Sequence, residues 1–325
     1  MLFVGEVFYI YARHTIGDQV LGIKKTSYMR PNPVSLYSPI PNAVGVHESR
    51  GNYKVKYFFD DKGRKKIRQN RNVSKTLHFF GDSFTFGYGV TNDDTALNLL
   101  AEKVNQRINI QNYGVAGYGI ELMYLRLMEH IDEIKPGDVV VFSLTSQDLA
   151  RGWPGRSRPC VMALNKAGPS LFPRIVEGKV EYVDVEQECS FLFDTLLSNT
   201  SFAFSIGRLY KSLRDRAAHQ EIFASADEIF AEAKRLANSR GASFRLVFLP
   251  TPVECERQAH VRNIDGLKTP HLNLLQRCPT DPASLQALRF PSGAHLSPEG
   301  NRWAADVLYS SLGELETITM ARPSD

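Results

Sequence analysis

The chain has 325 residues, 43% of them hydrophobic, so it can bury one large core, or one domain with a smaller appendage. This composition excludes a disordered or fibrous protein. The formal net charge of +4 is small for this length, and most basic residues are interspersed with acidic ones. Charge therefore does not indicate a nucleic-acid partner.

The cysteines are widely spaced and form no C-x-x-C pair; they are Cys160, Cys189, Cys255 and Cys278. This spacing argues against a structural zinc site and against a dithiol redox centre. We expect neither a metal nor a cofactor. The spacing favours buried or incidental thiols, with two disulfides as the alternative if the protein is exported.

The first 13 residues are mostly apolar, but a bilayer-crossing helix needs about 20. Glu6 interrupts them, no basic segment precedes them, and no small-residue cleavage site follows. The segment is either the stub of a longer membrane anchor or a helix packed on the body. Membrane association is expected only through such a truncated segment, and the location stays open between cytoplasmic and exported.

Residues 14–52 are rich in proline, serine, asparagine and glycine without a sustained period, which predicts an extended lead-in. Residues 53–59 alternate in polarity and turn residues follow them, which predicts a strand or hairpin against the main body. The basic run 64–75 is typical of a solvated strand and loop. We interpret residues 1–72 as an N-terminal extension and residues 73–318 as the main domain.

The apolar run Leu77–Phe80 predicts a buried strand, and Gly81 gives the backbone freedom for a sharp turn at its end. Ser83 follows this turn. The carboxyl edge of the strands is where open α/β sheets collect ligands, so Ser83 is a candidate nucleophile.

The following residues repeat a strand, a turn and a helix. Residues 108–113 and 138–144 are the second and third predicted strands, and helical spacing precedes each of them. The third is almost entirely apolar, which is typical of a strand buried on both faces. The repeat predicts a parallel sheet with right-handed crossovers.

The repeat of strand, turn and helix stops at residues 151–200. Their pattern predicts an irregular insertion, with a tight turn at 177–179 between short strands. An insertion beside the third strand's end would overhang a site there and influence substrate choice. A helical pattern at 202–240, a strand at 244–249 and a short strand at 285–290 follow. Together these elements predict an α/β fold: a three-layer α/β/α sandwich with a mainly parallel five-stranded sheet.

The last predicted element is a C-terminal helix that opens with Ser297 as N-cap and Pro298 in the first turn. His295 therefore lies in a loop just before this helix. Four blocks of sequence now resemble, in order and spacing, those of the SGNH/GDSL hydrolase family. They are Gly81-Asp82-Ser83, Asn112 to Gly117, Ser146-Gln147-Asp148 and His295 to Gly300, within a resemblance that covers residues 75–315.

The resemblance implies a role for each matching residue. Ser83 would be the nucleophile, and its backbone N–H the first oxyanion donor. Gly117 would supply a second backbone N–H, and Gln147 a side-chain donor where the family usually has asparagine. His295 would be the general base and then the general acid.

The usual acid of this family lies three residues before the histidine, or two in some acyltransferase relatives. Ser292 and Gly293 occupy these positions here. In other triads, loss of the acid lowers turnover by roughly 10⁴. The histidine would instead be oriented by the Ser292 hydroxyl, a backbone carbonyl, or a carboxylate such as Asp148 or Asp281. A Ser–His dyad without an acid is chemically sufficient, although slower.

The resemblance implies a serine esterase or deacylase that hydrolyses an O-acyl ester of a small molecule or a glycan through an acyl-enzyme. One alternative is an O-acyltransferase that uses the same Ser83 and His295 but passes the acyl group to a glycan hydroxyl. The other is a binding protein that keeps the scaffold without the activity, which the missing acid and the altered donor motivate.

Overall fold

The computed structural model describes residues 28–68, 73–104, 107–151, 171–184, 222–257, 264 and 266–313. The predictions for the apolar segment 1–13, for most of the insertion at 151–200, and for Cys160 and Cys189 lie outside these residues. In the described part of the chain, no helix combines the length and apolar character that crossing a membrane requires.

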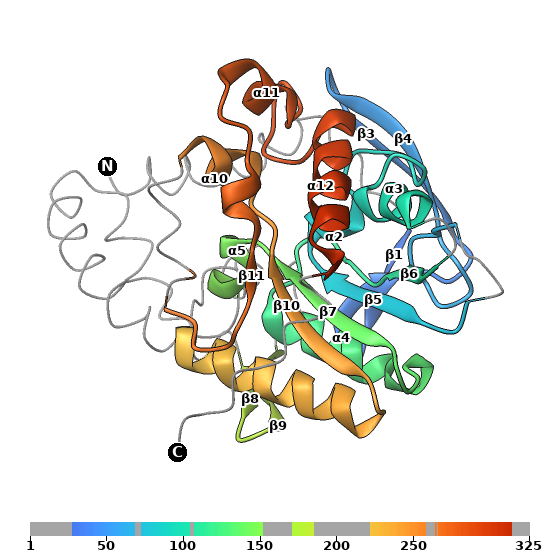
Figure 1. Cartoon of the computed structure of the whole chain (residues 1–325). Coiled ribbons are helices and arrows are strands. Elements are labelled where there is room, and N and C mark those ends of the chain that lie inside the picture. Colours follow the sequence, from blue (N-terminus) through green and yellow to red (C-terminus); the bar gives the residue numbers. More distant parts are fainter. Residues whose placement is uncertain are drawn as a thin grey trace, which may run out of the picture.

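The central sheet has five strands, all parallel, in the order β11-β10-β7-β5-β6 (Figure 1). The strands are β5 (Thr76–Gly81), β6 (Asn109–Asn112), β7 (Val139–Leu144), β10 (Ser243–Phe248) and β11 (Leu272–Asn273). Every residue of β7 is buried, as the continuous apolar run predicted. The predicted three-layer α/β/α architecture with a parallel five-stranded sheet is therefore confirmed.

Alternate residues of each strand supply the two layers of the core. On one face, Leu77 and Phe79 pack in an apolar cluster with helices α3 (Ala96–Lys103) and α12 (Pro298–Ser310). On the other face, Phe80 lies in a second cluster with α4 (Ile120–Glu129) and the helix over residues 222–239. Helices thus cover both faces of the sheet, and its carboxyl edge is left to the loops.

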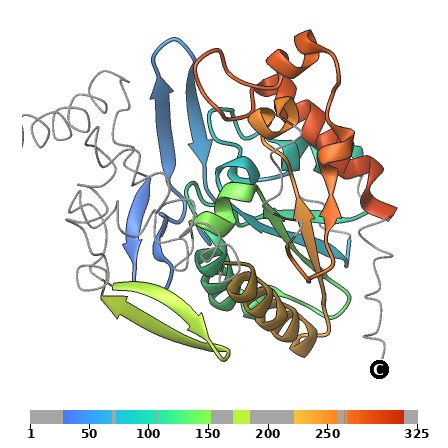
Figure 2. The ribbon, with the colours of Figure 1, turned by 90° about the vertical axis from the view of Figure 1, so that its left-hand side faces the viewer.

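The prediction of an extended lead-in before residue 52 is wrong for the described residues. Strands β1 (Met29–Asn32) and β2 (Leu36–Pro39) form one antiparallel pair, and β3 (Val44–Ser49) and β4 (Tyr53–Phe58) form another. Figures 1 and 2 show both pairs beside the central domain, outside its sheet. An aromatic cluster of Tyr28, Tyr57, Phe59 and Phe86 packs the extension onto the domain. The strand or hairpin predicted at residues 53–59 is confirmed by β4, whereas the packing of β1, β2 and β3 leaves no periodic signal in the sequence.

The prediction of a short strand at residues 285–290 needs correction. The first half of this stretch, residues 285–287, belongs to helix α11 (Pro282–Ala287), which Asp281 caps. An aspartate followed by proline is a helix start, and that signal outweighs the apolar pattern behind it. The fifth strand is β11, whose two residues are too few to show any periodicity.

The tight turn predicted at residues 177–179 is present. It joins β8 (Leu171–Val176) to β9 (Lys179–Asp184) in an antiparallel hairpin. Glu177 and Gly178 both have positive φ, as the tight turns of two-residue hairpins require.

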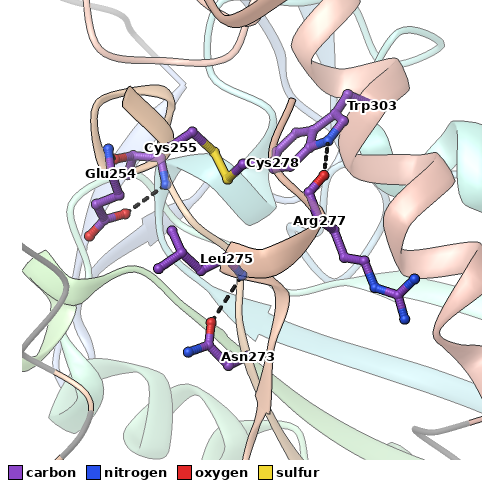
Figure 3. Close-up of a disulfide and its surroundings, with 8 residues drawn as sticks. Glu254, Cys255, Asn273, Leu275, Arg277, Cys278 and Trp303 are labelled. Atoms are coloured by element: carbon purple, nitrogen blue, oxygen red, sulfur yellow. Dashed lines mark hydrogen bonds between the residues drawn. A yellow bond between two sulfur atoms is a disulfide. The ribbon is translucent and has the colours of Figure 1, made fainter. Parts of the chain in front are cut away.

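A disulfide joins Cys255 in α10 (Pro252–Glu256) to Cys278, which follows the 3₁₀ helix η3 (Leu274–Arg277) (Figure 3). The prediction that the cysteines are buried or incidental thiols is therefore wrong for this pair. Close by, the indole Nε1 of Trp303 in α12 donates to the Arg277 carbonyl at 3.1 Å. The two contacts hold the segment after β10 against the C-terminal helix.

Replacing both Cys255 and Cys278 by serine is expected to lower the free energy of unfolding by about 3 kcal/mol. The disulfide closes a loop across a sequence separation of 23, which restricts the unfolded chain. Urea denaturation followed by circular dichroism measures the change. Replacing the exposed Ser310 by alanine is the control and should change the value by less than about 0.5 kcal/mol. An unchanged unfolding free energy in the double variant would contradict the expectation.

Candidate active site

Ser83 begins the short helix α2 (Ser83–Phe86), directly after β5 ends at Gly81. Asp82 caps this helix, its Oδ1 accepting from the backbone N–H of Phe84 at 2.8 Å. A Cβ atom on Gly81 would lie 1.9 Å from Thr85 Oγ1 and 2.7 Å from the Ser143 carbonyl oxygen. Only glycine permits this close turn, which places Ser83 at the carboxyl edge of the sheet.

His295 lies in the loop between α11 and α12, and its Nε2 is 2.9 Å from Ser83 Oγ although the residues are 212 apart in sequence. The imidazole packs between two aromatic rings, with centroid separations of 4.4 Å to Tyr88 and 5.4 Å to Phe84. For Nε2 to accept the serine proton, the neutral ring must carry its own proton on Nδ1. The structure thus brings together the residues expected as nucleophile and base.

An ion-paired cluster lies beside the serine. The Arg151 Nη1 donates to Asp82 Oδ2 at 2.8 Å and to Asp148 Oδ1 at 2.6 Å. Asp82 Oδ2 is also 3.3 Å from Ser83 Oγ. Burial, followed by the charge of Asp82, raises the pKa of Asp148 well above its ordinary value. The sequence interpretation gave no role to Arg151; its one signal is the position three residues after Asp148 on α5 (Ser146–Ala150).

The expected oxyanion donors follow three adjacent strands. Gly117 lies in the turn after β6 with φ of +86°, where glycine is the favoured residue. That turn lies close to the serine turn, because the Val115 N–H donates to the Gly81 carbonyl at 3.0 Å. Gln147 is exposed on α5 after β7, and its Oε1 accepts from Arg151 Nη2 at 3.2 Å. This contact leaves the amide N–H groups of Gln147 available to a ligand.

The three side chains considered as orienters of the histidine have other partners. The Ser292 hydroxyl donates to Asn52 Oδ1 at 2.9 Å, and Asp281 Oδ1 accepts from the Ser284 N–H at 2.8 Å. Asp148 Oδ2 accepts from the Thr145 N–H at 2.7 Å. Among the described residues, none donates to or accepts from His295 Nδ1. The described site is therefore a Ser–His pair without a carboxylate on the histidine.

Burial shapes the electrostatics of the site. It is the main reason that the pKa of His295 lies below the ordinary value; the charge of Asp82 raises this pKa and that of Arg151 lowers it. His47 of β3 is the second imidazole nearby, with its ring 4.4 Å from that of Tyr88. Burial, and then the charge of His295, lowers the pKa of His47 to about 4. No signal in the sequence pointed to His47, because its segment was predicted to be an extended lead-in.

His78 is a further imidazole, buried in β5. Its Nε2 lies 3.0 Å from Asp138 Oδ2 and its Nδ1 3.2 Å from the Tyr113 hydroxyl. Within the ranges that the structure describes, no group of three or more His, Cys, Asp or Glu side chains is arranged to hold a metal ion.

The model of the GDSL-like lipase/acylhydrolase family matches residues 79–303, which is more than half of the chain. The chain belongs to the GDSL-like lipase/acylhydrolase family. Its match to this ester-hydrolysing family includes the Ser83 turn, the glycine-bearing turn with Gly117, α5 and His295. Among curated proteins, none matches the chain.

The solved structures to which the chain is similar include TesA, a lipase and an aryl esterase. TesA is 13% identical, with 74% of this chain and 99% of that chain covered and a TM-score of 0.42. The lipase Lip_vut3 from a goat rumen metagenome is 11% identical, with 73% and 97% covered and a TM-score of 0.43. An inhibitor-bound aryl esterase of M. smegmatis is 12% identical, with 74% and 100% covered and a TM-score of 0.39. At these scores, membership of the family depends on the family-model match alone.

NMR titration of the imidazole ring protons should give a pKa below about 6.5 for His295 and of about 4 for His47. Burial penalises the charged ring, so each imidazole stays neutral to a lower pH than a solvated histidine does. Spectra of the His295→Gln and His47→Gln variants assign the two signals. A His295 pKa at or above the ordinary value would contradict the expectation.

Proposed function

We propose that this protein is a serine esterase or deacylase that cleaves an O-acyl ester of a small molecule or a glycan. The observation that carries the proposal is the 2.9 Å separation between Ser83 Oγ and His295 Nε2 at the carboxyl edge of the sheet. Family membership supports the general reaction, because the family consists of lipases and acylhydrolases. The arrangement matches the hydrogen-bonded nucleophile and base that acyl transfer requires.

In the proposed reaction, His295 Nε2 takes the hydroxyl proton as Ser83 Oγ bonds to the ester carbonyl carbon. Negative charge then develops on the carbonyl oxygen, and the backbone N–H groups of Ser83 and Gly117 and the amide of Gln147 are the proposed donors to it. The carbon–oxygen bond to the alcohol breaks as His295 returns the proton to the leaving oxygen. Water repeats the sequence on the acyl-enzyme, which releases the acid and regenerates Ser83.

The electrostatics support a neutral histidine as the base. With its pKa lowered by burial, His295 is unprotonated at neutral pH and can accept a proton. Asp82 favours the imidazolium that then forms, since its charge raises the same pKa. Arg151 opposes this effect while it pairs with Asp82. We infer that these charges give partial support to the imidazolium in a site that lacks the family's usual acid.

Ser83→Ala is expected to lower kcat for an aryl acetate by about 10³-fold or more, because it removes the nucleophile. His295→Ala should have a comparable effect, and the double variant should be no slower than the slower single variant, since the two residues act as one unit. Stopped-flow or plate assays of phenol release measure all three. Ser239→Ala, an exposed serine on the helix over 222–239, is the matched control. Wild-type turnover in Ser83→Ala would contradict the mechanism.

The same assay separates hydrolysis from transfer to a glycan. A glycan acceptor is added to the aryl acetate, and free acetate and acylated glycan are quantified by mass spectrometry. Acetate as the main product supports the esterase. Acylated glycan as the main product, dependent on Ser83, would instead assign an O-acyltransferase with the same acyl-enzyme. No turnover and no Ser83-dependent acylation in either arm would indicate a binding protein.

Gln147→Glu is expected to lower kcat by about 10²-fold to 10³-fold, because the side chain keeps its length and its acceptor for Arg151 but loses the N–H donors. Gln147→Asn, which restores the family's usual residue, should retain more activity than the glutamate variant. Steady-state kinetics with an uncharged ester measure both. Equal activity of wild type and Gln147→Glu would remove Gln147 from the set of donors.

A further inference from the structure

We propose that the β3–β4 hairpin positions His295 for catalysis, with Asn52 at its turn as the principal positioning residue. This inference depends on the proposed function, since it assigns a role in the same Ser–His chemistry. The hairpin lies outside the segment matched by the family model, which begins at residue 79. The candidate site thus includes a part of the chain that the family match does not cover.

The first observation is the contact between the hairpin turn and the loop that precedes the histidine. Asn52 Nδ2 donates to the Ser292 carbonyl at 2.9 Å. Asn52 Oδ1 accepts from the Ser292 N–H at 3.2 Å and from the Ser292 hydroxyl at 2.9 Å. One asparagine therefore binds the donor, the acceptor and the side chain of a residue 240 positions away.

Ser292 is also the position three residues before the histidine, where the family usually has the acid. Here its side chain is directed to Asn52, and the loop around it is exposed, with Gly293 at a φ of +155°. Exposed loop backbone containing such a glycine has few internal restraints. The contacts from Asn52 supply restraint close to His295, where a carboxylate would otherwise orient the ring directly.

The second observation is that the contact continues into a packed aromatic group. Next to Asn52, the ring of Tyr53 lies 5.0 Å from that of Phe290, two residues before Ser292 in the same loop. A Cβ on Gly89 would come within 2.8 Å of both Tyr53 and Phe290, so these groups are in close contact. The loop with His295 is therefore held on the hairpin at two positions that precede the histidine, Phe290 and Ser292.

The third observation links the hairpin to the ring on which the histidine rests. The ring centroid of Tyr88 lies 4.4 Å from that of His295 and 4.4 Å from that of His47 of the hairpin. The Tyr57 hydroxyl of β4 accepts from the Gly89 N–H at 2.8 Å and lies 2.9 Å from His47 Nδ1. The hairpin thus fixes the backbone beside Tyr88, and Tyr88 limits the positions of the imidazole.

These contacts have a kinetic consequence. Catalytic groups need to be held within about 0.5 Å of the productive geometry, and a misplacement of about 1 Å can cost 10²-fold in rate. A histidine without a carboxylate on Nδ1 depends on packing and on its loop for this precision. Loss of the Asn52 contacts should therefore slow the chemical step while leaving substrate binding unchanged.

The test compares wild type with Asn52→Ala, with Ser83→Ala as the reference for the proposed function. Asn52→Ala is expected to lower kcat for an aryl acetate by about 10-fold to 10²-fold with KM changed less than about 2-fold. Asn52→Asp, which keeps the acceptor for the Ser292 N–H and hydroxyl but loses the donor, should recover part of the rate. The matched control is Glu48→Ala on the same hairpin, where Glu48 forms an ion pair with the exposed Lys54 at 3.2 Å.

Thermal unfolding of each variant separates positioning from folding. The inference is supported if kcat falls in Asn52→Ala but not in Glu48→Ala, while the two variants have the same unfolding midpoint. Asn52→Asp should then recover part of the lost kcat. Unchanged kcat in Asn52→Ala, or an equal fall in Glu48→Ala, overturns it. A loss of activity explained by the unfolded fraction also overturns it. Wild-type turnover that persists in Ser83→Ala defeats the proposed function itself, whatever the Asn52 result.

Discussion

The hydrogen bond between Ser83 Oγ and His295 Nε2 is the contact on which the proposed chemistry depends. It joins the turn after β5 to the loop before α12, so it forms only if those two elements pack on the same side of the sheet. The shared apolar cluster of β5, α3 and α12 provides this packing, and Asn301 of α12 accepts from the Ala96 N–H of α3 at 3.0 Å. The core therefore positions the site, and the loops supply its chemistry.

The site balances two opposing effects on the histidine. Burial against Tyr88 and Phe84 lowers its pKa, which favours a neutral base but disfavours the imidazolium formed during the reaction. In a triad, a carboxylate on Nδ1 offsets this cost. Here the charge that raises the pKa is Asp82, beside the serine rather than on Nδ1. We infer that precise placement of the ring, through Asn52 and Tyr88, is correspondingly more important.

The fold was predictable from the sequence because the apolar runs of β5, β7 and β10 are long and each ends in turn residues. The alternation of residues 53–59 predicted β4, whereas β1, β2, β3 and β11 were missed or misplaced, since two-residue strands and tertiary aromatic packing leave no periodic signal. The pairing of Ser83 with His295 was predicted from the resemblance of four sequence blocks to the SGNH/GDSL hydrolase family. Arg151, His47 and Asn52 could not be found this way, because each makes a contact between segments that no motif connects.

The most direct test of the central claim is peptide mapping by mass spectrometry after reaction with a fluorophosphonate probe. The mechanism predicts one adduct on the peptide that contains Ser83, formed slowly in His295→Ala and absent in Ser83→Ala. An adduct on another serine, or equal labelling of wild type and Ser83→Ala, would contradict the assignment of Ser83 and His295 as an activated pair.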